Sequence, residues 1–311
     1  MTRRALPFFL FTVLLAVYLV LYSLTDFNQL TTTPLNQRSK PRVAIVSYYG
    51  GKGSELVASL TFPNKIAYAS HHDYTFHDYT DRRKLWPKGQ FSGYFDKFKA
   101  ILDLLHQNTY DWVFWTDTDS IFLNRTLSLT EFLDPRYNII LPTTEPSNPH
   151  FAKVINSGHF LVRNSAWSRD LNVVNGWLPI CDSDGEYWQY DQGALMWSFQ
   201  KWGRDVQCHV KSVGSRHLAS EWPWYDEGDL IIHLPGREAT QRVLLFTDLM
   251  EITDLRTGSL NHSDPRYVHL KSESPSSEHP SVARLRVDKE YVDIGWNRVC
   301  GDDEGELAAL I

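Results

Sequence analysis

The sequence predicts an α/β domain with a mostly parallel sheet, and three observations support this fold class. Short runs of β-branched and aromatic residues without charge recur along the chain, as in strands that are buried on both faces of a sheet. An amphipathic segment precedes the clearest of these runs, so helix and strand alternate. The chain has 311 residues, of which 42% are hydrophobic and 22% are charged, so it can bury a sizeable core.

The first predicted strand, residues 43–47, runs into a glycine-rich turn at residues 48–53. A first strand that ends in such a turn is typical of nucleotide-binding α/β domains, although neither the G-x-G-x-x-G nor the P-loop spacing is present. We therefore assign Ser47 and Tyr48, at this junction, to a candidate ligand site. Residues 64–69 lead towards a helix.

A helix is predicted over residues 93–107, before the strand at residues 112–116. Lys97 and Lys99 are expected off its apolar face, where Lys97 either reaches a phosphate or is simply solvated. The expected apolar face comprises Tyr94, Phe98, Ile101, Leu102 and Leu105. Further predicted elements are strands at residues 74–76, 138–141, 159–162 and 230–233, a helix at 194–199 and a loop at 270–280.

Two aspartates, Asp117 and Asp119, directly follow the strand at residues 112–116. If the backbone stays extended, side-chain alternation places both carboxylates on the same side. Ligands of open α/β sheets bind at the carboxyl ends of the strands. Mg²⁺ and Mn²⁺ both prefer carboxylate oxygens, often together with substrate phosphates. The pattern favours a metal-dependent site for a diphosphate, hence for a nucleotide-sugar, and Thr118 belongs to it.

Chance is the alternative, because about one Asp-x-Asp triplet is expected in a chain of this length. A second copy, Asp182-Ser-Asp184, lies in a polar stretch that is typical of a turn. The context of the first pair favours a function, since carboxylates beside buried aromatic residues need partners, and a metal ion is a suitable one.

Two polar stretches are further candidates. Asn156, Ser157 and Gly158 form a predicted turn, which either presents an amide and close backbone to a polar ligand or is purely structural. Asp191, followed by Gln192, precedes an apolar helix. Asp191 is therefore either the N-cap of that helix or a carboxylate of the pocket.

His233 ends an apolar strand, as the two aspartates do, although a lone histidine is more often structural. No cysteine or histidine cluster has the spacing of a zinc site. The net charge is −6 and no long basic run exists, which argues against nucleic acid as a partner.

The N-terminal segment predicts a type II membrane protein. Residues 1–4 form a cytoplasmic tail with two arginines, and residues 5–24 an uncharged anchor long enough to span a membrane. A cleaved signal peptide is the alternative, but no small-x-small cleavage site follows the apolar run. Residues 25–41 are a polar stem, and residues 42–311 form the lumenal domain.

A lumenal domain permits a disulfide, and the chain has three cysteines. The preferred pair is Cys181 with Cys208, which would brace the segment around Asp191, and Cys300 would remain unpaired. Two Asn-x-Ser/Thr acceptors, Asn124 and Asn261, are consistent with a glycoprotein.

Taken in series, these stretches resemble glycosyltransferase family 34, which groups fungal galactosyl- and mannosyltransferases with plant xyloglucan xylosyltransferases. The order and spacing are similar over about residues 42–240. The matching stretches are Lys97 with its helix, residues 112–124, residues 156–164, residues 191–195 and residues 233–236. The resemblance implies a GT-A fold, a Rossmann-like α/β/α sandwich that uses a nucleotide-sugar, which is a UDP- or GDP-sugar, and Mn²⁺, with Mg²⁺ as the alternative.

The resemblance also implies roles for single residues. Asp117 and Asp119 match the metal motif, and His233 matches the third protein ligand. Asp191 and Gln192 match residues beside the transferred sugar, so they are the catalytic candidates.

Asn156, Ser157 and Gly158 match a segment that lines the donor-sugar site. The chain departs from the family after Gly236, which is followed by Arg237 where cysteine and then lysine are expected. We assign Arg237 to the role of that phosphate-binding lysine. The family retains the anomeric configuration, which would need no dedicated protein base.

Three alternatives stay open. One is an inverting transferase with Asp191 or Glu186 as general base. Another is a catalytically silent, membrane-tethered carbohydrate-binding protein. The third, a metal-dependent phosphohydrolase, needs more ligands than are visible. Galactose, mannose and xylose donors are all compatible with the sequence, and the acceptor is expected to be a glycan. The oligomeric state is left open. The membrane topology favours the Golgi over the endoplasmic reticulum.

Overall fold

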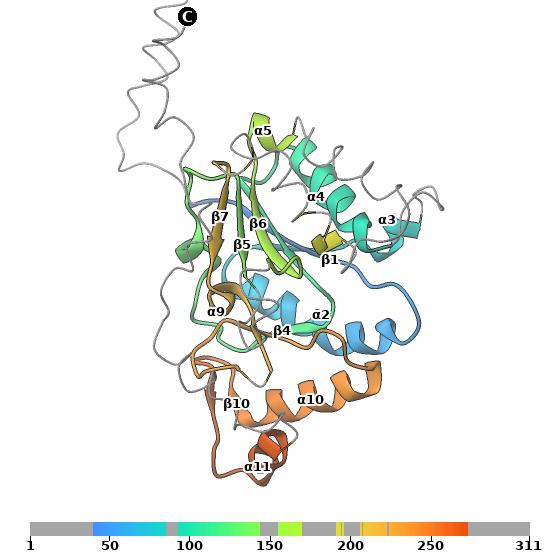
Figure 1. Cartoon of the computed structure of the whole chain (residues 1–311), viewed down its shortest axis with the longest axis vertical. Helices are drawn as coiled ribbons and strands as arrows, with labels where there is room; N and C mark the ends of the chain where they lie inside the picture. Colours follow the sequence, from blue (N-terminus) through green and yellow to red (C-terminus); the bar gives the residue numbers. More distant parts are fainter. Residues whose placement is uncertain are drawn as a thin grey trace, which may run out of the picture. The chain divides into compact units, whose positions relative to one another are not determined.

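The structure is a computed structural model (Figure 1). It describes residues 40–84, 93–143, 155–169, 191–193, 195, 206, 208–222 and 224–272. The predicted tail and anchor and nearly all of the stem lie outside these ranges. Within them, no helix has the length and apolarity needed to cross a membrane.

A six-stranded sheet forms the centre, in the order β2-β1-β3-β6-β5-β7. Its strands are β1 (Val43–Ser47), β2 (Thr75–Asp78), β3 (Trp112–Thr116), β5 (Ile139–Pro142), β6 (His159–Arg163) and β7 (Val210–Val213). Neighbouring strands are parallel except that β6 runs antiparallel to both β3 and β5. The predicted mostly parallel sheet is therefore confirmed.

Alternation along β3 explains how this sheet is covered on both faces. Val113 and Trp115 pack in one cluster with apolar residues of helix α4 (Asp96–His106), which follows a 3₁₀ turn, η2 (Gly93–Phe95). Trp112 and Phe114 pack in another cluster, with residues of helix α2 (Ser54–His71). All five residues of β3 are buried, as expected for a strand between two layers of helices.

A second, three-stranded sheet lies beside α2, in the order β4-β9-β8. Its strands are β4 (Ser120–Phe122), β8 (Ser220–Glu221) and β9 (Ile231–His233). Helix α10 (Ala239–Ile252) packs against α2 (Figure 1). Its residues Leu245, Phe246 and Leu249 share a core with this small sheet.

The remaining elements are short. They are α3 (Thr80–Lys84), η3 (Leu129–Phe132), α5 (Ala166–Arg169), α9 (Ser215–Leu218), β10 (Thr253–Asp254), β11 (Ser259–Leu260) and α11 (Pro265–Ser272). The loop predicted at residues 270–280 is wrong for its first residues, which belong to α11. Pro265 starts that helix, where a missing N–H costs no hydrogen bond.

The prediction for the helix at residues 93–107 is wrong in two details. Tyr94 does not join the apolar face, since it is 53% exposed. It lies in the 3₁₀ turn, which has fewer residues per turn than an α-helix and so shifts the phase of the pattern. Lys97, expected off the apolar face, is buried, because carboxylates of the candidate site surround its ammonium group.

Other predictions need smaller corrections. The second strand begins one residue later than expected. The helix expected at residues 194–199 lies almost entirely outside the described residues. Cys208 is disulfide-bonded, and its partner also lies outside them, so the pairing with Cys181 stays a prediction.

Candidate active site

The two aspartates lie in a tight connection between the sheets. β3 ends at Thr116, the chain turns at Thr118 and Asp119, and β4 begins at Ser120. The condition that the backbone stays extended is therefore not met here, so side-chain alternation is not what brings the two carboxylates together. The turn is fixed by hydrogen bonds from the Asp117 N–H to the Gly158 carbonyl (2.8 Å) and from the Ser120 hydroxyl to the Asp117 carbonyl (2.8 Å).

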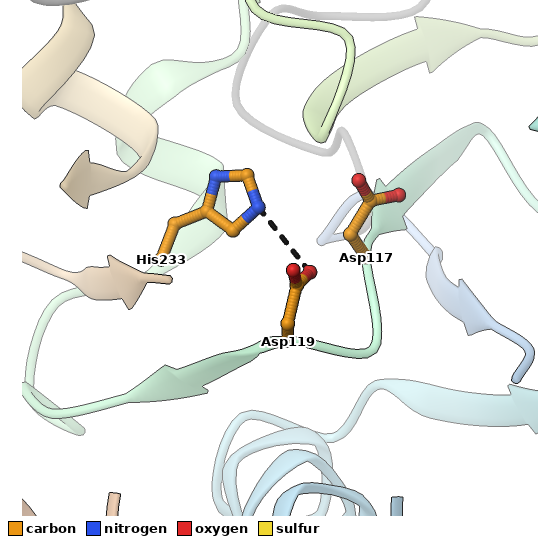
Figure 2. A group of neighbouring side chains, drawn as sticks. All are labelled: Asp117, Asp119 and His233. Carbon is orange, nitrogen blue, oxygen red and sulfur yellow. Dashed lines mark ion pairs between the residues drawn. The ribbon is translucent and has the colours of Figure 1, made fainter. Parts of the chain in front are cut away.

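Strand pairing brings a histidine to this turn. Ser120 of β4 lies opposite His233 of β9, and the Leu234 N–H donates to the Asp119 carbonyl (3.0 Å). Ligand atoms of Asp117, Asp119 and His233 lie within 4.8 Å of one another. Figure 2 shows the three side chains beside one another, with a dashed line for the ion pair between His233 and Asp119. His233 Nε2 lies 3.3 Å from Asp119 Oδ1.

This donor set fits a divalent cation. Two carboxylates and an imidazole suit Mn²⁺ or a similar metal ion. The turn before β6 lies close against two of these groups. A Cβ at Gly158 would lie 2.8 Å from His233 Cε1 and 3.1 Å from Asp117 Oδ2, so only glycine fits there. The three residues that the sequence suggests as metal ligands are thus brought together.

Burial and charge act in opposite directions on these groups. Burial alone would raise the pKa of Asp119, but His233 and Arg242 outweigh it and lower that pKa to about 2. Burial would lower the pKa of His233, yet Asp119 and Asp117 outweigh it and raise that pKa. Burial raises the pKa of Asp117. Without a metal ion, Asp119 is therefore an anion that His233 and Arg242 neutralise.

Metal affinity should fall as the pH falls, because His233 must be neutral to act as a ligand. Since its pKa is raised, protons compete with the metal at a higher pH than they would at an ordinary histidine. We expect Mn²⁺ affinity, measured by EPR between about pH 8 and about pH 5.5, to drop by about tenfold per pH unit below the histidine pKa. His233→Gln should bind Mn²⁺ more weakly but with a shallower pH dependence; equal slopes in both proteins would contradict this role.

Lys97 connects the candidate metal ligand Asp117 to the predicted sugar-binding residues. Its Nζ lies 2.8 Å from Asp191 Oδ2 and 3.4 Å from Asp117 Oδ1, and it donates to the Ser157 carbonyl (3.1 Å). Burial would lower the pKa of Lys97, but the aspartates outweigh it and raise that pKa. Lys97 is therefore a buried cation whose three acceptors are already in place.

The turn before β6 is held by the other candidates. The Ser157 hydroxyl donates to Asp191 Oδ2 (2.7 Å), and the Ser157 N–H donates to Gln192 Oε1 (3.2 Å). Asn156 Oδ1 accepts from the Gly158 N–H (2.8 Å). Asp191 thus faces the site and is not only an N-cap. The two predicted sugar-binding stretches, around Ser157 and at Asp191 and Gln192, are in direct contact.

A further carboxylate was not anticipated. Asn156 Nδ2 donates to Glu221 Oε1 (3.2 Å), and β8 places Glu221 beside His233. Burial raises the pKa of Glu221. His159 is also fully buried, with its ring 4.7 Å from that of His233, and neither ring nitrogen has a hydrogen-bond partner among the described residues.

A cavity of about 430 Å³ opens beside the aspartates, within the size range of small-molecule sites. It is lined by Tyr48, Gly50, Gly51, Ser54, Val57, Gly93, Tyr94, Lys97, Trp115, Asp117, Thr118, Asp119 and Arg242. The Thr118 hydroxyl donates to the Tyr48 carbonyl (2.5 Å), so the glycine-rich turn and the aspartate turn are joined. Ser47 is completely buried and does not line this cavity.

The two arginines differ in position. Arg237 lies in the β9–α10 connection, does not line the cavity, and has no hydrogen bond or ion pair from its side chain within the described part of the chain. Arg242, from α10, lines the cavity and lies 2.7 Å from Asp119 Oδ2. The sequence reasoning missed Arg242, although Glu238 and Gln241 form a capping box that marks the start of its helix.

Lys65 of α2 was missed as well. Its Nζ donates to the carbonyls of Asp117 (2.9 Å) and Thr118 (3.2 Å), and the residue is fully buried. Burial lowers the pKa of Lys65 to about 7 despite the nearby aspartates. A lysine within a helical run of apolar residues was the available signal, since such a lysine needs a specific acceptor.

The lowered pKa of Lys65 predicts a pH-dependent stability. Between about pH 7 and pH 10.5 the unfolded chain binds a proton at Lys65 that the folded chain lacks, so stability rises with pH. We expect urea unfolding in EDTA to show the wild type gaining about 2–3 kcal/mol relative to Lys65→Met between about pH 7 and pH 9.5. Parallel stability curves for the two proteins would show that Lys65 titrates normally in the fold.

Residues 42–137 match the model of the galactosyl transferase GMA12/MNN10 family. The resemblance to glycosyltransferase family 34 is confirmed. One relative, galactomannan galactosyltransferase 1 of Cyamopsis tetragonoloba, is 26% identical over 149 residues, which cover 47% of this chain and 30% of the relative. Xyloglucan 6-xylosyltransferase 4 of Arabidopsis thaliana is 33% identical over 97 residues, which cover 29% and 18%.

The segments that align with these curated relatives therefore span about a third or less of the relatives' length. The match to the family model at residues 42–137 includes Lys65, Lys97 and both aspartates but not His233 or Arg242, which only the fold brings to the site. A solved glycosyltransferase involved in the glycosylation of the major capsid of PBCV-1 has a similar fold, with a TM-score of 0.53. It is 16% identical and covers 67% of this chain and 99% of its own, so the α/β glycosyltransferase fold is established.

Proposed function

We propose that this protein is a metal-dependent glycosyltransferase of the GT-A type, which moves a galactosyl, mannosyl or xylosyl unit from a nucleotide-sugar to a glycan acceptor. The observation that carries the proposal is the cluster of Asp117, Asp119 and His233 at the edge of a cavity of about 430 Å³. The family match and the names of the relatives support the same reaction class. Galactose and xylose donors have the support of those names; mannose rests on the family resemblance.

A divalent cation at the three ligands would bind the donor diphosphate and stabilise the negative charge that develops as it leaves. Lys97 holds Asp117 and Asp191 in fixed positions, so the metal side and the sugar side of the site keep a constant spacing. Asp191 and Gln192 support the turn at Ser157 against which the donor sugar is expected to lie.

We further propose that the reaction retains the anomeric configuration. The bond from the sugar C1 to the phosphate oxygen breaks, and a bond from C1 to the acceptor oxygen forms on the same face. The proton of the acceptor hydroxyl passes to the released phosphate oxygen, so no protein base is required.

The inverting alternative would use Asp191 as the base. Its Oδ2 already faces Lys97 and the Ser157 hydroxyl, so as a base Asp191 would have to act through its other oxygen or give up these partners. Glu186, the other candidate base, lies outside the described residues. NMR analysis of the product anomer separates the two schemes.

The decisive test uses the full chain in detergent with a panel of UDP- and GDP-sugars, with and without Mn²⁺, while released nucleotide is measured. We expect slow release from one donor, which EDTA abolishes. If no donor is hydrolysed and no nucleotide binds in a metal-dependent way, the silent carbohydrate-binding protein becomes the better description.

The location in the Golgi membrane is also a proposal. It rests on the uncharged run at residues 5–24 and the arginines before it. Protease digestion of intact vesicles should leave residues 42–311 protected; digestion of that domain would place it on the cytoplasmic side.

A further inference from the structure

The positively charged Arg242 lies beside Asp119, one of the candidate ligands of the metal ion. Its guanidinium lies 2.7 Å from Asp119 Oδ2, on the opposite oxygen from the one that faces His233. Its side chain is 21% exposed, towards the cavity that it lines. Asp119 is thus neutralised from two sides by groups of the protein, in the arrangement that a bound metal ion would have to replace.

The guanidinium keeps capacity for another acceptor. Its Nε donates to the Leu234 carbonyl (3.0 Å), which orients the group at the end of β9. One terminal nitrogen faces Asp119, and the other has no hydrogen bond within the described ranges. A planar guanidinium held at one edge can turn its remaining donors to a phosphate with a small change in geometry.

The other cations near the site lack this capacity. Lys97 is already surrounded by Asp191, Asp117 and the Ser157 carbonyl. Lys65 donates to two backbone carbonyls and does not line the cavity. Arg237 does not line it either. Among the described residues, Arg242 is therefore the cavity cation best placed to receive a dianionic diphosphate.

We propose that Arg242 binds the diphosphate of the nucleotide donor, and that its pairing with Asp119 is the resting arrangement of the metal-free site. This inference rests on the proposed function. A divalent cation bound to Asp119 would neutralise the carboxylate, so the Arg242 guanidinium could turn to another acceptor. The same residue would thus neutralise Asp119 when no cation is bound and contribute to donor binding when one is bound.

A purely structural Arg242 would behave differently. In that case the residue serves to hold Asp119 and the end of β9 in place, and its loss would weaken metal binding itself. In the proposed role, Arg242 competes with the metal for Asp119, so its loss leaves metal binding equal or tighter while nucleotide binding weakens. The two roles therefore predict opposite effects on Mn²⁺ affinity.

The test measures two affinities of the full chain in detergent. Mn²⁺ binding is followed by EPR without nucleotide, and binding of UDP and GDP by calorimetry at saturating Mn²⁺. The variants are Arg242→Gln, which keeps an amide donor, Arg242→Lys, which keeps the charge, and Arg237→Gln. Arg256→Gln, at a side chain that is 84% exposed, is the control.

We expect Arg242→Gln to weaken binding of the preferred nucleotide by about 10- to 100-fold, with Mn²⁺ binding equal or tighter. Arg242→Lys should bind the nucleotide more tightly than Arg242→Gln but more weakly than the wild type. If the glutamine variant does not fold, the lysine variant is compared with the wild type instead. Arg256→Gln should match the wild type. The inference is overturned if Arg242→Gln weakens Mn²⁺ binding alone, if it leaves nucleotide affinity unchanged, or if Arg237→Gln causes the loss instead. A wild type that binds neither nucleotide would overturn the proposed function as well, so the two failures are distinguishable.

Discussion

Replacing Asp119 by asparagine is expected to lower metal-dependent donor hydrolysis by at least about 10³-fold. The amide keeps the size of the side chain but loses the charge that His233, Arg242 and a bound metal ion all require. The measurement is the rate of nucleotide release at saturating Mn²⁺, together with Mn²⁺ affinity by EPR. Both quantities should fall, because the carboxylate is one of only two in the cluster.

The second Asp-x-Asp triplet supplies a matched control for this prediction. Asp182→Asn makes the same chemical change in a triplet that the sequence assigns to a polar turn, so activity should stay within about twofold of the wild type. If Asp119→Asn keeps full activity with Mn²⁺ present, the group of Asp117, Asp119 and His233 does not bind a metal ion that the reaction needs.

Replacing Lys97 by methionine is expected to destabilise the fold by about 3–5 kcal/mol. Lys97 is 3% exposed and pairs with two carboxylates, so its removal leaves Asp117 and Asp191 close together without a cation. The free energy of unfolding is measured with urea in EDTA at neutral pH, so that bound metal does not compensate. The buried ion pair is thus costly to break from one side.

A double mutant tests the cause of that loss. Asp191→Asn in the Lys97→Met background should recover more than about 1 kcal/mol, since it removes one of the two stranded charges. Lys99→Met is the control on the same helix: Lys99 pairs with Asp96 near the surface, and its loss should cost less than about 1 kcal/mol. Equal losses at the two lysines would mean that the Lys97 pairs contribute little.

Local sequence patterns predicted five of the six strands of the central sheet, and missed β7, whose Val-Lys-Ser-Val sequence is not an uncharged apolar run. β1 and β3 are uncharged runs buried along their whole length, and such runs have few alternatives. The aspartates after β3 were found for the same reason, because polar groups at the end of a buried strand have few other uses. Their geometry was not predictable: a turn and a second sheet, rather than an extended backbone, bring Asp117, Asp119 and His233 together.

The residues that were missed or misplaced depend on contacts between distant parts of the chain. Lys97 looks like a surface lysine of its helix, and the acceptors that the fold brings to Lys97 and Lys65 explain why both are buried. Arg242 lies on a helix whose packing partner, α2, is far away in sequence. No periodicity within one helix contains this information.

The pairing of β4 with β9 makes the position of His233 depend on the number of residues in β9. His233 faces the aspartates because Ser120 is its partner in the register of a three-residue strand. Side chains alternate between the two faces of a strand, so a slip of one position would turn the imidazole away and present Ile232 instead. An insertion or deletion within β9 would therefore remove a proposed metal ligand from the site while leaving His233 in the sequence.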